Sequence, residues 1–235
     1  MAKGLRQIIA LGGGGFSVEP DNPALDSYIA QQARQARPRV SFVPTATGDS
    51  SRYIAGFYTA FAKLDCRPSH LPFFQRTPEL KSYLLQQDVV YVGGGNTKSM
   101  LAVWRDWGLP ELLREAWERG VVLAGVSAGA ICWFEQCLTD SFAGSLTVLD
   151  CLGFLPGSCC PHYDGEPERQ AIFHELILKG EILPGFGLED SAAIHFIDQD
   201  IYRIIASEPD AKVYQVRRAN GTVEERALPA EYLGI

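Results

Sequence analysis

The stretch VVLAGVSAGA, residues 121–130, decides the fold of this chain. Its first six residues are apolar or small, as in a strand that is buried on both faces. Ser127 follows directly and lies between Gly125 and Gly129 in the pattern G-x-S-x-G. In this pattern a strand turns sharply into a helix, and the strained turn lifts the serine oxygen above the sheet. We therefore expect a buried strand, a turn at Ser127 and a helix over residues 131–136.

The same alternation of strand and helix extends over the first two thirds of the chain. Short β-branched runs alternate with helical patterns, which is typical of a parallel sheet covered by crossover helices. After residue 156 the pattern changes to strands, and Asn220-Gly221 is a strong signal for a two-residue hairpin. We expect strands at residues 7–11, 39–44, 69–73, 88–92, 120–125, 198–206, 212–217 and 222–227, and helices at 24–36, 51–64, 97–107 and 110–119, with another starting near Thr77.

Length and charge limit the classes of protein and partner. The 235 residues are enough for one domain, residues 1–235, to bury a core without a disulfide or a structural metal. Asp and Glu number 28 against 21 Lys and Arg, which gives a formal net charge of −7. Nucleic acids and anionic membranes bind clustered basic residues, and none cluster here. We therefore expect neither as a partner.

The spacing of the cysteines indicates whether the chain binds a metal, and its first residues indicate its cellular location. No C-x-x-C pair occurs, so zinc and redox motifs are poorly supported, and we expect buried free thiols and no metal or cofactor. The start of the chain leads into an apolar stretch without a secretory cleavage pattern, and no apolar run approaches the roughly 20 residues that cross a bilayer. We expect a cytoplasmic protein. Its cysteines are Cys66, Cys132, Cys137, Cys151, Cys159 and Cys160.

A glycine loop can complement the serine. Gly93-Gly94-Gly95 also follows a strand and precedes a helix, so its backbone amides can approach Ser127 closely. A tetrahedral intermediate needs two such donors, and the amides of Gly95 and Ala128 are the candidates for an oxyanion hole. A phosphate site is the rival use of such a loop, but the lysine of G-K-[ST] and the spacing G-x-G-x-x-G are absent.

The serine needs a base and a carboxylate. His162 stands where a short apolar stretch gives way to a polar loop, so we expect it to be the base. We expect the other histidines to be structural. The carboxylate that orients the imidazole is either Asp140, shortly after the nucleophile, or Glu189, at the end of an apolar strand. Sequence alone leaves these two open.

These motifs resemble the peptidase E family of serine peptidases, which includes aspartyl dipeptidases and cyanophycinases. The resemblance extends to about Phe196 and rests on the motifs at residues 92–97, 125–130, 161–162 and 187–190. It implies a flavodoxin-like or class I amidotransferase-like α/β sandwich of three layers with a mainly parallel sheet. It also implies a Ser127 nucleophile, a His162 base and oxyanion donors at Gly95 and Ala128.

The resemblance also bears on the acid and the substrate. The dipeptidase branch places an aspartate near Asp140, whereas the cyanophycinase branch uses a glutamate that matches Glu189, and we favour Glu189. The family implies a dipeptidase that prefers an N-terminal aspartate. The basic residue of its acidic-basic cluster falls near Glu168 here and Arg169 is one position away, so we expect only modest discrimination, with Arg169 and Asn96 contacting the substrate.

Other functions remain open at this point. They are a cyanophycinase-like peptidase acting on β-Asp-Arg, a serine esterase and, from another class, an inactive binding module. An amidotransferase would need a cysteine at the elbow, where this chain has Ser127. We expect a short peptide as substrate, and the number of subunits stays open, a homodimer included.

Overall fold

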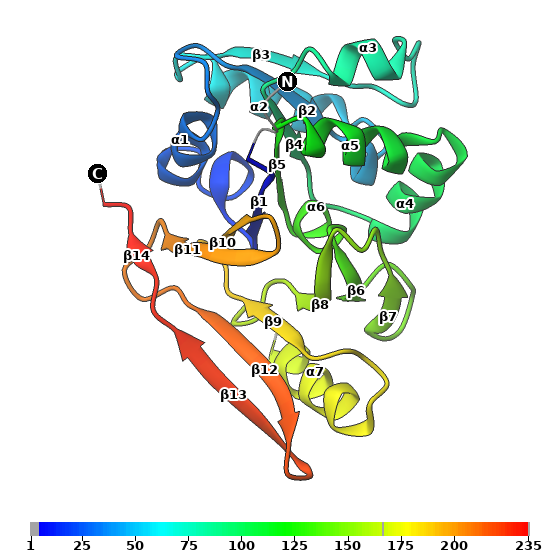
Figure 1. Ribbon diagram of the computed structural model, residues 1–235, viewed down its shortest axis with the longest axis vertical. Coiled ribbons are helices and arrows are strands. Elements are labelled where there is room, and N and C mark those ends of the chain that lie inside the picture. Colours follow the sequence, from blue (N-terminus) through cyan, green and yellow to red (C-terminus); the bar gives the residue numbers. More distant parts are fainter. Residues whose placement is uncertain (1–4, 166, 235) are drawn as a thin grey trace.

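The computed structural model describes residues 5–165 and 167–234, and in these residues the chain forms two sheets (Figure 1). The larger sheet has the order β14-β11-β10-β1-β5-β4-β2-β3. Five neighbouring strands are parallel, in the order β1, β5, β4, β2 and β3. Strand β10 runs antiparallel to β1 and to β11. The strands of this sheet are β1 (Gln7–Leu11), β2 (Arg39–Val43), β3 (Arg67–His70), β4 (Val89–Val92), β5 (Val122–Val126), β10 (Ala192–Ile197), β11 (Asp200–Ala206) and β14 (Glu231–Tyr232).

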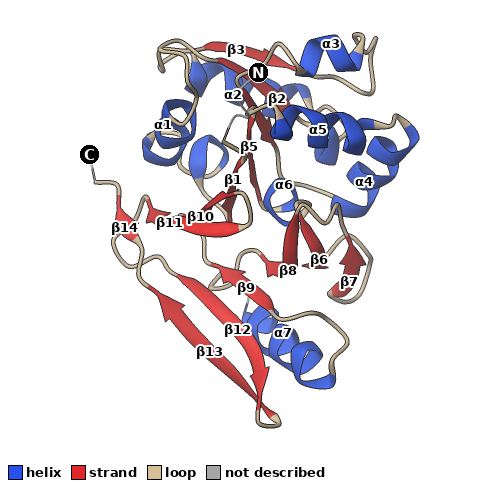
Figure 2. Ribbon diagram, in the orientation of Figure 1, coloured by secondary structure: helices blue, strands red, loops and turns tan. Residues whose placement is uncertain are grey.

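Helices cover both faces of this sheet and make the expected three-layer α/β sandwich (Figure 2). Successive residues of a strand face opposite sides, so Ile9 packs with the helices of one face and Ile8 with those of the other. Burying a side chain such as Leu113 stabilises the fold by about 1.5–3 kcal/mol. The first face carries α1 (Ala24–Gln31) and α2 (Ser51–Phe61), and the second carries α3 (Leu80–Leu84), α4 (Thr97–Asp106) and α5 (Leu109–Glu118).

The second sheet is larger than the C-terminal hairpin that the sequence predicted. Its order is β13-β12-β9-β8-β6-β7, and the expected hairpin at Asn220 forms its outer edge. Helix α7 (Pro167–Lys179) packs on it through Phe173 and Ile177. The strands are β6 (Phe134–Thr139), β7 (Thr147–Asp150), β8 (Leu155–Cys160), β9 (Gly185–Leu188), β12 (Val213–Ala219) and β13 (Thr222–Leu228).

The helix expected over residues 131–136 is wrong. After Ser127 the chain makes the single turn α6 (Ala128–Ile131) and then enters β6. Trp133 and Phe134 are fully buried, and β6 pairs with β7 and β8. Aromatic residues favour strands, and sheet pairing overrides the local helical pattern here.

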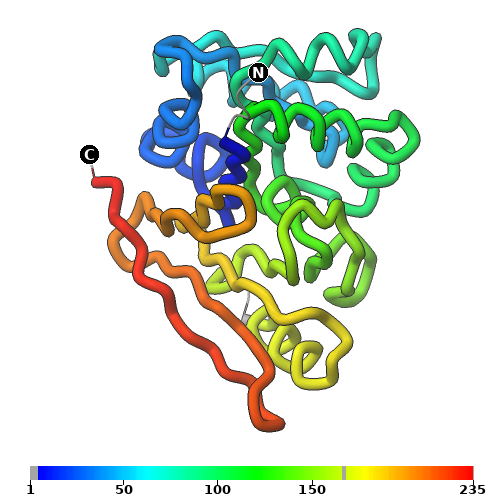
Figure 3. The backbone as a smooth tube through the Cα atoms, viewed as in Figure 1, coloured from blue at the N-terminus to red at the C-terminus, as the bar shows by residue number. Residues whose placement is uncertain are grey.

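The chain crosses between the two sheets several times (Figure 3). It leaves the larger sheet after β5 and α6, builds β6 to β9, and returns at β10. It crosses again between β11 and β12 and between β13 and β14, so links between the sheets follow β5, β9, β11 and β13. No helix of the described residues is long and apolar enough to cross a membrane.

Candidate active site

Ser127 lies on a sharp turn between β5 and α6. Its backbone has φ 54° and ψ −117°, a conformation that is costly for a residue with a side chain. A Cβ on Gly125 would overlap the carbonyl of Gly129, and a Cβ on Gly129 would overlap the carbonyl of Val92. Both glycines are therefore needed for the strand and the turn to approach so closely.

His162 reaches Ser127 from the second sheet, just after β8. Its Nε2 lies 2.9 Å from Ser127 Oγ, within reach for a general base. Its backbone φ is also positive, at 50°. The imidazole is 25% exposed, so one side of the pair faces solvent. The two sheets thus each contribute one member of the pair.

Asp190 is the carboxylate beside His162, and it lies on the three-residue link between β9 and β10. Its Oδ1 lies 2.6 Å from His162 Nδ1. A carboxylate at Nδ1 favours the tautomer whose Nε2 can accept a proton. The backbone amide of Asp190 donates to Asp164 Oδ1 at 2.9 Å. Ser127, His162 and Asp190 therefore form one continuous chain of hydrogen bonds.

The structure places neither Glu189 nor Asp140 beside His162. Glu189 accepts hydrogen bonds from the Lys212 amide at 2.7 Å and from the Tyr214 hydroxyl at 3.0 Å. Neighbouring side chains of an extended segment point to opposite sides. Because Asp190 faces His162, Glu189 faces β12, which it ties to the end of β9.

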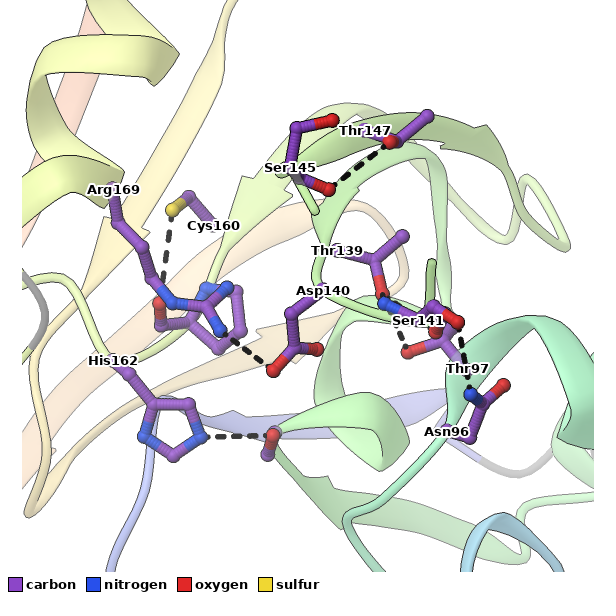
Figure 4. A network of polar contacts seen from close by, with 12 residues as sticks. Asn96, Thr97, Thr139, Asp140, Ser141, Ser145, Thr147, Cys160, His162 and Arg169 are labelled. Atoms are coloured by element: carbon purple, nitrogen blue, oxygen red, sulfur yellow. Dashed lines mark hydrogen bonds and ion pairs between the residues drawn. The ribbon is translucent and has the colours of Figure 1, made fainter. Parts of the chain in front are cut away.

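Asp140 contacts Arg169 instead. Its Oδ2 lies 3.3 Å from Arg169 Nη2, and Figure 4 shows the arginine reaching from α7 toward it. Arg169 is 2% exposed and Asp140 is 65% exposed. Strands β6 and β8 run parallel with Cys137 opposite Cys159, so Asp140 and His162 leave the same edge of the second sheet. Arg169 therefore lies at the edge that carries His162.

A loop of three glycines passes across Ser127. A Cβ on Gly94 would lie 3.2 Å from Ser127 Cβ and 3.7 Å from its Oγ. The Gly94 amide donates to the Tyr53 hydroxyl at 3.2 Å. In the described part of the chain the Gly95 amide has no hydrogen-bond acceptor. Ala128 is the first residue of α6, where an amide has no partner within the helix.

Asn96 caps helix α4. Its Oδ1 accepts a hydrogen bond from the Ser99 amide at 2.8 Å, and its Nδ2 donates to the Ser141 carbonyl at 3.1 Å (Figure 4). An N-cap of this kind stabilises a helix by about 1 kcal/mol. Asn96 thus joins the glycine loop to the segment after β6, and its contact with substrate stays a prediction.

One signal for Asp190 was present in the sequence, in the glycines after β1. A Cβ on Gly13 would lie 2.6 Å from Asp190 Cγ and 3.1 Å from His162 Cε1. A Cβ on Gly14 would lie 3.2 Å from Ser191 Cα. These glycines let the first loop run against the link that carries Asp190, and their number indicates a close backbone approach.

Each of the remaining histidines bonds to a tyrosine hydroxyl: His70 to Tyr58, His174 to Tyr163 and His195 to Tyr28. Burial, with help from Arg203, lowers the pKa of His195 to about 4, and its ring bonds to Tyr28. Cys132 is fully buried, and burial raises the pKa of its thiol well above the ordinary value. None of the six cysteines, all of which lie in the described residues, takes part in a disulfide. Within the described ranges, no group of three or more His, Cys, Asp or Glu side chains is arranged to hold a metal.

An α/β fold with a serine on a strained strand-to-helix turn, next to a histidine, is the arrangement of serine hydrolases. The sequence profile of peptidase family S51 matches residues 8–204. The chain therefore belongs to this family and is a serine-type peptidase.

Relatives agree with this assignment, and solved structures share the fold. The peptidase YgaJ of Bacillus subtilis (strain 168) is 52% identical over 231 residues, which span 98% of this chain and 100% of that protein. Peptidase E of Streptomyces coelicolor is 27% identical over 75% of this chain and 74% of its own length. The crystal structure of a peptidase from an acI-B1 Actinobacterium matches with a TM-score of 0.68 at 19% identity, over 96% of this chain and 95% of that one. A putative peptidase E protein from Listeria monocytogenes EGD-e matches with a TM-score of 0.63 at 21% identity, over 86% and 98%.

Proposed function

We propose that this peptidase hydrolyses short peptides with a catalytic triad of Ser127, His162 and Asp190. The observation that carries the proposal is the hydrogen-bonded chain between them, with 2.9 Å from Ser127 to His162 and 2.6 Å from His162 to Asp190. In this proposal Asp190, and not the Glu189 that the sequence favoured, is the carboxylate of the triad.

The reaction follows from this geometry. Ser127 Oγ attacks the substrate carbonyl while His162 Nε2 takes its proton, and Asp190 stabilises the imidazolium that forms. The Gly95 and Ala128 amides stabilise the oxyanion. His162 then gives its proton to the leaving amine, and the acyl group stays on Ser127. Water activated by His162 releases the acyl group and restores the serine.

The substrate we propose is a dipeptide with a free N-terminus and an acidic first residue. Arg169 supports this, because a guanidinium can hold a carboxylate with two hydrogen bonds. Asp140 already faces Arg169, with its Oδ2 3.3 Å from Arg169 Nη2. An incoming carboxylate must compete with Asp140, so the preference for acidic residues is modest.

A panel of peptides tests this proposal. It contains Asp-Xaa, Glu-Xaa and neutral dipeptides, a β-Asp-Arg dipeptide and a neutral ester. We expect kcat/KM to be highest for Asp-Xaa and measurable for neutral dipeptides. If the ester alone is hydrolysed, or β-Asp-Arg is the best substrate, the proposed specificity is wrong.

Arg169→Lys tests the role of the arginine. Lysine keeps the charge beside Asp140 but loses the planar fork that holds a carboxylate. We expect kcat/KM to fall for Asp-Xaa and to stay near the wild-type value for neutral dipeptides. An equal fall for both classes would mean that Arg169 only supports the fold.

A further inference from the structure

The link that carries Asp190 is short and joins two sheets. It consists of Glu189, Asp190 and Ser191, between β9 of the second sheet and β10 of the larger one. Ser191 has φ 62°, a left-handed conformation. Any relative movement of the two sheets would displace the Asp190 carboxylate from His162, so this link needs an anchor outside both strands.

Glu19 lies at this link, and both of its carboxylate oxygens accept hydrogen bonds there. Its Oε1 accepts a hydrogen bond from Ser191 Oγ at 2.5 Å, and its Oε2 accepts one from Ser207 Oγ at 2.8 Å. Ser207 follows β11, and its amide donates to the Ser191 carbonyl at 2.9 Å. The carboxylate therefore joins Ser191 to the end of a neighbouring strand.

The backbone of Glu19 is itself fixed. Its amide donates to the Gly15 carbonyl at 2.8 Å, and its carbonyl accepts from the Asn22 amide at 2.9 Å. The Asn22 side chain in turn donates to the Ser207 carbonyl at 3.2 Å. On the other side of the link, the Ser191 amide donates to the Gly13 carbonyl at 3.2 Å. The residue after Asp190 is thus bound on both sides by the segment that follows β1.

We propose that Glu19 is a positioning residue for the peptidase reaction, because it holds the turn that presents Asp190 to His162. Glu19 touches neither reacting atom and acts through Ser191. The inference rests on the proposed triad. A carboxylate is suited to this position because hydrogen bonds to a charged acceptor are about twice as strong as those between neutral groups.

The test compares Glu19→Gln and Glu19→Ala with Glu208→Gln, which alters an exposed glutamate next to Ser207. A misplacement of about 1 Å can cost on the order of 100-fold in rate. We expect kcat to fall about ten- to hundredfold in Glu19→Ala, less in Glu19→Gln and not in the control, with little change in KM. A loosened Asp190 stabilises imidazolium less, so the acidic limb of kcat/KM should move to lower pH.

Two further readouts separate this inference from the proposed function. The first is the rate at which a fluorophosphonate labels the serine, which needs no peptide substrate. The second is the downfield proton NMR signal of the His162 Nδ1 hydrogen, assigned by its loss in His162→Ala. In the Glu19 variants the labelling rate should fall and the NMR signal should weaken. If wild-type protein is not labelled at Ser127, the proposed function fails, and the NMR signal still reports whether Glu19 holds Asp190.

Stability is measured on the same samples. If the Glu19 variants unfold at lower temperature but keep the wild-type labelling rate, NMR signal and pH profile, Glu19 is only structural and the inference is wrong. If Glu19→Ala does not fold, Ser191→Ala removes the same hydrogen bond from its other end. That variant must then show the same loss, and wild-type behaviour in it would contradict the inference.

Discussion

At the scale of single residues, backbone strain and close contacts hold the three polar side chains. Ser127 and His162 both have positive φ, which few residues with side chains adopt. Such strain persists only where the surroundings fix it. Gly125 and Gly129 fix the serine turn, and Asp190 and Ser127 fix the imidazole from its two nitrogens.

Tyr53 is expected to support the loop of Gly93, Gly94 and Gly95. Its hydroxyl accepts the hydrogen bond of the Gly94 amide, next to Ser127. Tyr53→Phe leaves that amide without its acceptor, which costs about 1–3 kcal/mol. We expect kcat to fall several-fold with little change in KM, because the loop then holds the Gly95 amide less firmly.

Tyr58→Phe is the matched control for this change. Tyr58 lies on the same helix, and its hydroxyl bonds to His70 Nδ1 at 2.9 Å, on β3 at the far edge of the sheet. Its loss should lower the melting temperature and spare kcat. Equal effects of the two variants on kcat would show that Tyr53 does not act through the loop.

The sequence identified Ser127 and His162 as a pair but not their carboxylate partner. The serine is marked by glycines at a fixed spacing, and the histidine by the start of a polar loop. Glu189 and Asp190 are adjacent acidic residues, and only the direction of each side chain distinguishes them. That direction depends on the exact residue at which β9 ends, which the composition of the strand does not determine.

At the scale of elements, the run of glycines after β1, residues 12–15, contributes to positioning the link between β9 and β10. A Cβ on Gly13 would lie 2.6 Å from Asp190 Cγ. Gly13→Ala should therefore displace Asp190 from His162. We expect kcat to fall by a factor on the order of 100, measured on the best dipeptide of the panel.

Gly56→Ala serves as its control. Gly56 lies in α2, and a Cβ there would meet only Phe16 at 4.0 Å. Alanine favours a helix over glycine by about 1 kcal/mol, so this variant should be more stable and fully active. Normal activity of Gly13→Ala would mean that the loop does not constrain Asp190.

The elements of the larger sheet were predictable, and the one-turn α6 was not. Strands β1, β4 and β5 are apolar on both faces, and glycine or proline marks many of their ends. The segment after Ser127 has small and apolar residues that suit a helix locally. That segment continues as β6, which pairs with β8. The paired residues are distant in sequence, and no local pattern reveals the pairing.

At the scale of the whole molecule, two sheets meet at the hydrogen-bonded chain of Ser127, His162 and Asp190. Ser127 leaves the larger sheet, His162 leaves the second sheet, and Asp190 lies on a link between them. The second sheet could not be assembled from sequence beyond its hairpin, because β6, β8 and β9 belong to no repeated unit and pair with strands that are distant in the chain. Activity therefore requires that the two sheets keep their relative positions.

Buried Asp26 gives a prediction about stability of the whole molecule. Burial raises the pKa of Asp26 from its ordinary 3.8 to about 7, and its side chain is 2% exposed. The folded protein then binds this proton more tightly than the unfolded chain. Stability should therefore fall as pH rises from about 4 to about 7 and stay lower above that. The cost is at most about 4 kcal/mol, since one pKa unit corresponds to about 1.4 kcal/mol.

Asp26→Asn removes this ionisation. We expect it to raise the free energy of unfolding, relative to wild type, more at pH 8 than at pH 4.5, as measured by urea unfolding. Asp21→Asn, which alters an exposed carboxylate, should not change the pH dependence. If the free energy of unfolding differs between the two pH values as much in Asp26→Asn as in wild type, another group is responsible for the difference.

The most direct test of the triad is the rate of fluorophosphonate labelling, with the modified residue located by mass spectrometry. We expect an adduct on Ser127 and none in Ser127→Ala. Asp190→Asn should slow labelling greatly, because the same change costs about 10⁴ in kcat in a well-studied serine protease. Glu189→Gln should label at nearly the wild-type rate. Labelling elsewhere than Ser127, or a larger loss in Glu189→Gln than in Asp190→Asn, would contradict the proposed triad.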